Sequence, residues 1–119
     1  MNLKEINLHD SQILKVIEDC QNDTLDFILD YPIDYENNIF EKRTLRFHDF
    51  LNYKTSEIPF GQLPTILDFS DLGVIKYSIG EGKSEIEIER YKVEFKTTCG
   101  IRALEYKKVE LFKSDSDIK

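Results

Sequence analysis

The chain is 119 residues long, 40% of them hydrophobic, and carries a formal net charge of −7. This length and composition are typical of one globular domain and argue against a disordered chain. The negative charge disfavours nucleic acid and anionic membranes as partners, because both would repel the protein. The sequence has no apolar run long enough to span a membrane, and its first residues lack an export signal. We therefore expect a cytoplasmic protein.

The first two elements are predicted to be strands that form a hairpin. Residues 12–20 are rich in Ile, Leu and Val, and residues 25–31 alternate like a half-buried strand with mostly acidic side chains on its solvent face. Residues 21–23 supply the polar turn between them. Pro32 should end the second strand, because proline lacks the N–H that a β-ladder needs, and residues 34–38 should form a loop.

The middle of the chain is predicted to hold one strand, a long connection and one short helix. Residues 43–51 alternate between apolar and polar side chains, which is typical of a strand. Residues 52–63 contain proline and glycine and are predicted to be a connection. Pro64 suits the first position of a helix, so we expect a short helix near residues 64–71 that ends before Gly73.

The C-terminal part is predicted to return to strands. Residues 74–79 are one candidate, and the next run changes the parity of its apolar residues at Arg90, which suggests a β-bulge or a bend. A tight turn at Cys99-Gly100 should lead into residues 101–106. A second change of parity follows, before Val109.

These elements add up to about seven or eight short strands with little helix, so burial must come from sheet packed on sheet or from a closed barrel. The sequence predicts an all-β fold with minor α content, an antiparallel β-sandwich or sandwich-like barrel. We expect one β-rich domain over residues 1–113 and a frayed polar tail over residues 114–119. Cys20 and Cys99 lack a CxxC spacing and are expected to be reduced thiols.

Two His-Asp dipeptides are the only motifs that suggest catalysis or metal binding. Adjacent side chains of an extended segment point to opposite faces, so neither His9-Asp10 nor His48-Asp49 is expected to bind one ion. His9, Asp10 and Ser11 have the side chains of a catalytic triad, but consecutive residues cannot align as one. We expect these three to be structural, with Asp10 or Ser11 bonding a backbone N–H at the start of the first strand.

No catalytic residue, metal or cofactor is therefore predicted. The alternative interpretation is a small-ligand or metal-binding domain, or an enzyme, whose pocket holds His9 or His48 together with carboxylates.

Acidic residues are concentrated in residues 16–41, which contain eight of them and no Lys or Arg. Such a field would favour a basic partner, although surface charge also serves solubility. Aromatic and basic residues alternate between residues 91 and 108, but the aromatic residues have the parity of the core and glutamates balance the bases. Nucleic-acid binding is therefore not expected.

The run Leu8-His9-Asp10-Ser11, followed by an Ile-rich strand, resembles the opening of a group of small uncharacterised bacterial proteins. Leu45-Arg46-Phe47 with Phe50 resembles the group's middle strand, and residues 100–111 resemble its closing strands. Some members are identified as immunity proteins of polymorphic-toxin systems, and many have no assigned role. The group brings no established catalytic residues.

The resemblance implies a non-enzymatic protein that binds and neutralises a cognate toxin. The acidic residues would then steer the protein onto the basic cleft of a nuclease toxin. The contact residues expected on this basis are Asp26, Asp30, Asp34 and Glu36. The sequence leaves the oligomeric state open.

Overall fold

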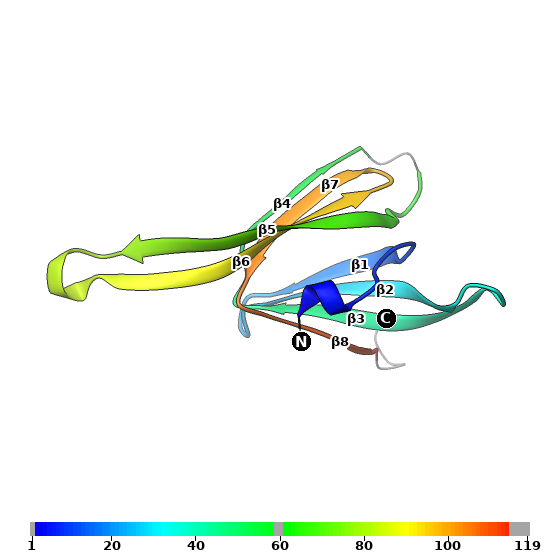
Figure 1. The fold of residues 1–119 in the computed structure, drawn as a ribbon, viewed down its shortest axis with the longest axis horizontal. Helices are drawn as coiled ribbons and strands as arrows, with labels where there is room; N and C mark the ends of the chain where they lie inside the picture. The colour runs from blue at the N-terminus through cyan, green and yellow to red at the C-terminus, as the bar shows by residue number, and fades with distance from the viewer. Residues whose placement is uncertain (1, 59–60, 115–119) are drawn as a thin grey trace.

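The computed structural model describes residues 2–58 and 61–114, which form eight β-strands and two short 3₁₀ turns (Figure 1). The strands are β1 (Gln12–Asp19), β2 (Thr24–Asp34), β3 (Ile39–His48), β4 (Leu51–Glu57), β5 (Ile66–Ile79), β6 (Ile86–Thr97), β7 (Gly100–Tyr106) and β8 (Lys108–Lys113). The turns are η1 (Leu3–Glu5) and η2 (Gly82–Ser84). All of the strand pairs are antiparallel, which confirms the predicted all-β class.

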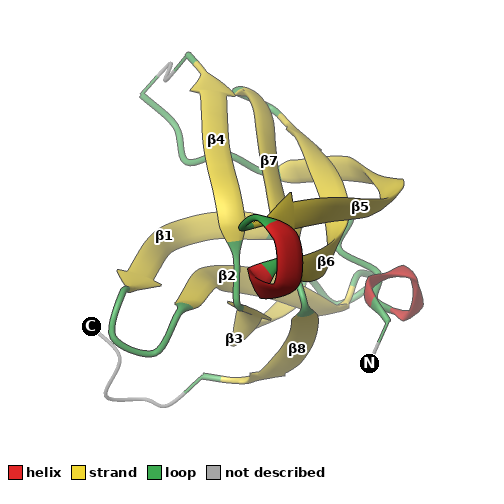
Figure 2. Ribbon diagram, turned by 90° about the vertical axis from the view of Figure 1, so that its left-hand side faces the viewer, coloured by secondary structure: helices red, strands yellow, loops and turns green. Residues whose placement is uncertain are grey.

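The strands form two four-stranded sheets that face each other, with the orders β1-β2-β3-β8 and β4-β7-β6-β5 (Figures 1 and 2). At one side, β7 of one sheet is followed directly by β8 of the other. There the Lys107 N–H donates a hydrogen bond to the His48 carbonyl at 3.0 Å. At the other side Gln12 bridges to Thr65, next to a hydrogen bond from the Ile66 N–H to the Ser11 carbonyl. The two facing antiparallel sheets form a sandwich-like arrangement, as predicted.

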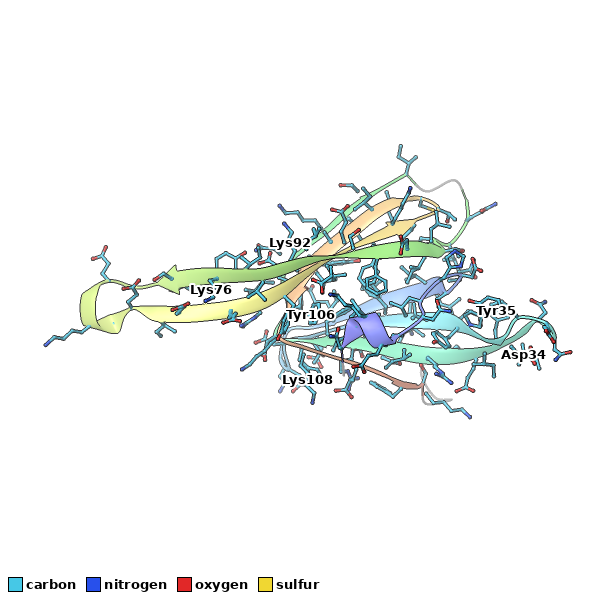
Figure 3. The ribbon with its side chains drawn as sticks, viewed as in Figure 1. Asp34, Tyr35, Lys76, Lys92, Tyr106 and Lys108 are labelled. Carbon is cyan, nitrogen blue, oxygen red and sulfur yellow. The ribbon has the colours of Figure 1, made fainter. Side chains whose placement is uncertain are left out.

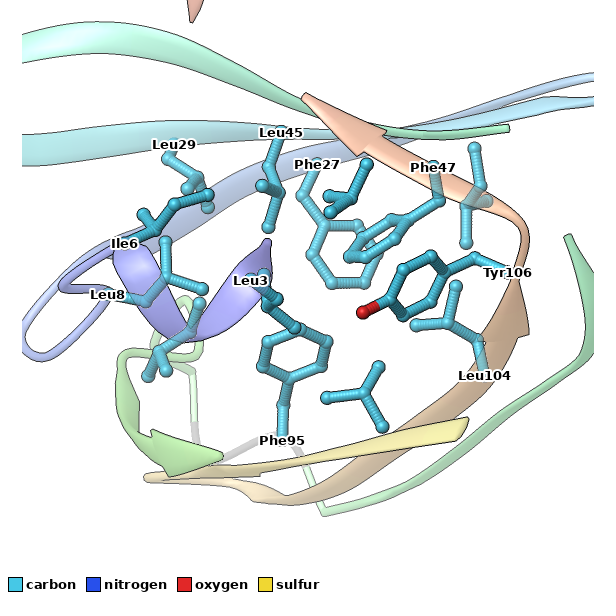
Figure 4. Close-up of a cluster of buried hydrophobic side chains, with 14 of the residues drawn as sticks. Leu3, Ile6, Leu8, Phe27, Leu29, Leu45, Phe47, Phe95, Leu104 and Tyr106 are labelled. Atoms are coloured by element: carbon cyan, nitrogen blue, oxygen red, sulfur yellow. The ribbon is translucent and has the colours of Figure 1, made fainter. Parts of the chain in front are cut away.

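Aromatic rings from both sheets meet in the core. Phe27, Phe47 and Phe95 are fully buried, and their ring centroids lie 5.4–6.0 Å apart in edge-to-face pairs. Leucine and isoleucine side chains from the N-terminal segment, Leu3, Ile6 and Leu8, pack into the same cluster (Figure 4). The residues before β1 are therefore part of the core.

The predicted helix near residues 64–71 is wrong, because residues 66–79 form the long strand β5. Ile66 is fully buried and Phe69 packs against the core from the same sheet. Pro64 is buried just before the strand, where its carbonyl accepts a hydrogen bond from the Ile13 N–H. Ile66 pairs with Thr97 of β6 and also bonds to the Ser11 carbonyl, and both partners are distant in sequence, so tertiary pairing overrides the local helix signals.

Three other boundaries also differ from the prediction. Strand β2 continues through Pro32 to Asp34, and a register shift between these two residues accommodates the missing N–H. The expected connection over residues 52–63 contains strand β4, which pairs with β7. Ser114 was expected to fray, but its N–H donates to the Lys42 carbonyl at 3.1 Å. The rest of the expected tail, residues 115–119, lies outside the described residues.

The two parity changes have different causes. The second lies at Lys107, where β7 is followed by β8 and the chain changes sheets. At the first, β6 is continuous, and the register shift lies on its partner β5 between Asp71 and Val74. Beyond this point the β5–β6 hairpin leaves the sandwich and projects from it (Figure 1). We call the projecting part, residues 74–91, the arm.

Candidate functional site

The β2–β3 turn extends from the end of the molecule opposite the arm (Figure 3), and we call residues 33–40 the β2–β3 tip. Asp34 organises the turn, because its carboxylate accepts hydrogen bonds from the Asn37 N–H at 3.2 Å and the Asn37 side-chain amide at 2.7 Å. These bonds hold the pKa of Asp34 below its usual value. Asn38 has a φ of +53°, a conformation that asparagine tolerates well. The tip is thus a locally fixed turn with a charged carboxylate.

Large apolar side chains are unusually exposed on this tip. Ile33 is 46% exposed, Tyr35 54%, Ile39 46% and Phe40 41%. Residues 33–40 also contain Glu36 and no Lys or Arg. Exposed aromatic and aliphatic groups rimmed by charge are typical of interaction surfaces, and aromatic residues are frequent energetic centres of interfaces.

The His9-Asp10-Ser11 motif lies beside the tip and supports it. The Tyr35 hydroxyl donates a hydrogen bond to the His9 carbonyl at 2.9 Å, and His9 Nδ1 lies 3.0 Å from the Asp10 carboxylate. Asp10 has a φ of +69° and its N–H donates to the Ile66 carbonyl. The Ser11 hydroxyl is buried without a hydrogen-bond partner. Backbone groups of Asp10 and Ser11, rather than their side chains, fix the start of β1.

The four expected contact residues do not all lie on this surface. Asp34 and Glu36 belong to the tip, and Asp30 lies farther along β2, opposite Lys42. Asp26 is only 8% exposed and binds Arg46, so its carboxylate is not free for a partner.

The acidic stretch of the sequence is divided by the fold. One group of acids lies at the β1–β2 turn, and the tip lies at the other end of β2, about 30 Å away for a strand of this length. Within the stretch, Asp26 is paired with Arg46, and Glu41 lies 3.5 Å from Arg43. The concentrated field expected from the sequence therefore becomes two smaller acidic surfaces.

The two histidines lie far apart and have separate partners. His48 Nε2 lies 2.6 Å from the Glu110 carboxylate, and this contact holds the pKa of Glu110 below its usual value. His9 lies beside the tip, whereas His48 pairs with Thr24 near the β1–β2 turn. Over the described residues, no group of three or more His, Cys, Asp or Glu side chains is arranged to hold a metal ion. Cys20 and Cys99 are free thiols.

Two surface pockets are lined by other residues than these histidines. A pocket of about 450 Å³ lies where the arm meets the β7–β8 bend, with Tyr91, Tyr106 and Lys108 in its wall. Burial raises the pKa of Tyr106 to about 12, and Asp71 and Tyr91 add to the effect. A second pocket, of about 280 Å³, lies at the base of the arm on its other face. The first pocket carries charges of both signs and indicates no particular ligand.

Sequence reasoning identified the acids of the tip but missed its apolar residues. Ile33 and Tyr35 precede the turn, and Ile39 and Phe40 follow it. A pair of apolar residues on each side of an acidic Asn-Asn turn was the available signal. The prediction ended the second strand at Pro32, placed residues 34–38 in a loop and began the next strand only at Arg43, so it concealed the pairing around the tip.

Comparison of the chain with known proteins gives no match, either to a protein-family model or to a curated protein. Within residues 2–58 and 61–114, no helix is long and apolar enough to cross a membrane.

Proposed function

We propose that this protein is a non-enzymatic protein-binding domain and that the β2–β3 tip binds a basic protein. This is the role of an immunity protein that neutralises a cognate bacterial toxin. The observation that carries the proposal is the exposure of Ile33, Tyr35, Ile39 and Phe40 beside Asp34 and Glu36, in a segment without Lys or Arg.

The apolar and acidic groups have different tasks in this proposal. Tyr35 and Phe40 are the anchors, because burying large aromatic side chains supplies much of the free energy of binding at protein interfaces. The carboxylates of Asp34 and Glu36 attract a basic surface, accelerate association and make it sensitive to salt. A basic active-site cleft, such as that of a nuclease, fits both requirements.

The tip is also organised before any partner arrives. Asn37 donates two hydrogen bonds to the Asp34 carboxylate, which fix the turn. The Tyr35 hydroxyl donates a hydrogen bond to the His9 carbonyl. Groups that are already ordered lose less conformational entropy when they bind. The N-terminal motif thus has a supporting role in the proposed function, without acting as a catalyst.

The test is capture of partners from a lysate of the native cell, with the whole protein as bait at low and high salt. The bait variant Tyr35→Ala/Phe40→Ala removes the anchors, and Ile101→Ala is the matched control, because Ile101 is a similarly exposed apolar residue on strand β7. We expect one basic protein to be retained by wild type and control, lost by the tip variant and released by salt.

The captured protein should then be purified and titrated against each variant. Loss of both anchors should weaken binding at least tenfold, since each anchor is worth about 1 kcal/mol or more. Equal affinity of the tip variant and wild type would overturn the assignment of the tip. A partner whose binding is insensitive to salt would contradict the role of Asp34 and Glu36.

A further inference from the structure

The arm has one apolar and one polar face. Directly opposite residues of β5 and β6 share a face, so Ile75 lies beside Arg90, Tyr77 beside Ile88, and Ile79 beside Ile86. The side chains of the arm's apolar face are Ile75, Tyr77, Ile79, Ile86 and Ile88. The other face carries Lys76, Ser78, Glu87 and Glu89, with Val74 and Tyr91 at its base. This alternation is typical of a sheet that buries one side.

Within the described chain, nothing packs over the outer end of the apolar face. Ile79 is 53% exposed and Ile86 63%, and from the Ile75–Arg90 pair outward β5 and β6 pair only with each other. A two-stranded ribbon is marginally stable in water by itself, and exposed isoleucines do not stabilise it. On the polar face, the Lys76–Glu87 ion pair is long at 3.9 Å and well exposed, so it contributes little. The outer end of the apolar face is therefore open to a partner.

The base of this face is polar and basic. Tyr77 donates a hydrogen bond to the Glu105 carboxylate, which also accepts one from the Asn52 amide at 2.9 Å. These residues line the pocket of about 280 Å³, together with Lys54 and Lys92. The Glu105 carboxylate thus already accepts two hydrogen bonds. The ammonium groups of Lys54 and Lys92 form no ion pair within the described structure. The pocket can accept an acidic group.

The far end of the arm has the opposite sign. Its turn carries Glu81, Lys83 and Glu85, a net charge of −1. Glu85 accepts a hydrogen bond from Ser78, whereas the Glu81 side chain is exposed to solvent. An apolar stripe that is basic at one end and acidic at the other is complementary to itself in the reversed direction.

We propose that a second copy of this chain covers the apolar face, with the two arms packed face to face and antiparallel about a two-fold axis near Tyr77 and Ile88. Lys92 lies four residues from Ile88 toward the base, about 13 Å, and Glu85 lies three residues toward the turn, about 10 Å. The arrangement therefore brings Glu81 of each copy to the Lys54 and Lys92 pocket of the other. Two-fold symmetry forms this contact twice.

Pairing of two β5 edges is the other way to join two copies, and the structure disfavours it. Such a pairing would extend the sheet and leave the isoleucines exposed to water. The register shift near Gly73 and the charge of Lys76 also obstruct edge pairing. Face-to-face packing removes the apolar surface from water and satisfies the charges at both ends.

The size of the contact sets its strength. The stripe is two strands wide and six residues long, about 10 Å by 20 Å, which is far below the roughly 800 Å² per partner of a standard interface. The dimer is therefore weak and reversible, and it forms at high protein concentration.

The first experiment is sedimentation equilibrium of the whole protein from about 10 µM to about 1 mM, which covers micromolar to millimolar dissociation constants. Wild type should change from monomer to dimer over this range. Ile79→Lys/Ile86→Lys should stay monomeric, because it places four charges in the contact. Val74→Lys is the matched control, since Val74 is 46% exposed on the other face of the same arm, and it should dimerise like wild type.

A wild-type protein that remains monomeric at about 1 mM overturns the proposal. So does a control variant that loses dimerisation as completely as the double variant. Circular dichroism spectra of both variants should match that of wild type, since all of the substituted residues are exposed.

A charge exchange tests the antiparallel orientation. Glu81→Lys and Lys54→Glu should each weaken the dimer severalfold, because each places like charges at the contact. The combined variant should recover most of the wild-type affinity. Two weakened single variants whose combination is weaker still would rule out the proposed contact between the arm turn and the basic pocket.

Discussion

Arg46 binds the carboxylate of Asp26 through two parallel hydrogen bonds across the β2–β3 pair, from Nε to Oδ1 at 2.8 Å and from Nη2 to Oδ2 at 2.9 Å. The hydrogen bonds to Asp26 raise the pKa of Arg46, so its guanidinium stays charged. Asp26 is mostly buried, and paired geometry of this kind is among the stronger side-chain interactions. The Asp26 carboxylate therefore stabilises the fold and is not free to contact a partner protein.

We expect Asp26→Asn to lower the free energy of unfolding by about 1–3 kcal/mol, because it weakens charge-assisted bonds to a partly buried guanidinium. Urea denaturation measures the change. Asp30→Asn on the same strand is the control and should change stability by less than about 0.5 kcal/mol. Similar values for the two variants would contradict a structural role that is special to Asp26.

The Cys99–Gly100 turn leaves no room for a side chain at Gly100. Gly100 has a φ of +146°, and a Cβ there would lie 2.1 Å from the Ser56 carbonyl oxygen of β4. Gly100→Ala should therefore destabilise the protein by about 2 kcal/mol or more. Gly61→Ala is a matched control, because Gly61 has a positive φ but nothing within 4 Å of the added atom. A thermal unfolding curve like that of the control would disprove the clash.

Glu57 should make the fold sensitive to acid. Burial alone would raise the pKa of its carboxyl, but hydrogen bonds from Arg102 at 2.6 Å and Thr97 at 2.7 Å hold the pKa below its usual value. A depressed folded-state pKa stabilises the protein above the unfolded value of about 4.3. This stabilisation is lost as the pH falls through the folded-state value.

Urea unfolding between pH 7 and pH 3 checks this expectation. Glu57→Gln should be less stable than wild type at neutral pH, and its stability should fall less steeply in acid, since the variant cannot bind the additional proton. If the free energy of unfolding fell with the same slope below about pH 5 in wild type and variant, protonation of Glu57 would not be linked to folding.

The buried Ser11 hydroxyl offers a test of the N-terminal motif. It is fully buried and lacks a hydrogen-bond partner, so Ser11→Ala should be neutral or slightly stabilising, within about 1 kcal/mol. Differential scanning calorimetry of the two proteins is sufficient. A marked loss of stability would mean that the hydroxyl has a partner in solution.

The alternation of apolar and polar residues was sufficient to predict those strands whose pairing partners are close in the sequence. The β1–β2 hairpin and the Cys99–Gly100 turn were predicted because alternation and turn residues lie side by side. The start of β5 was not, since Pro64 and Gly73 mimic the ends of a helix and the pairing partner lies at Ser11 and Gln12. Strand β4 has few apolar residues, so its alternation was weak.

The candidate site shows the same limit. Asp34 and Glu36 were chosen as acids of the stretch over residues 16–41, by the same criterion as Asp26 and Asp30. The pairing of Asp26 with Arg46 depends on the β2–β3 register, which brings together residues twenty positions apart. Exposure of Tyr35 and Phe40 depends on the same register. Charge counted along a chain therefore overestimates the charge that a folded surface presents.

The projection of the arm has a consequence for amide hydrogen exchange. Strands β2, β3 and β6 carry the buried aromatic cluster, so their amides there should exchange through global unfolding and report the full stability of the protein. The arm amides have no core above them and should open locally, with protection factors far below those of the core. In a sample concentrated enough to pair the arms, residues 74–91 should become slower while the core rates stay unchanged.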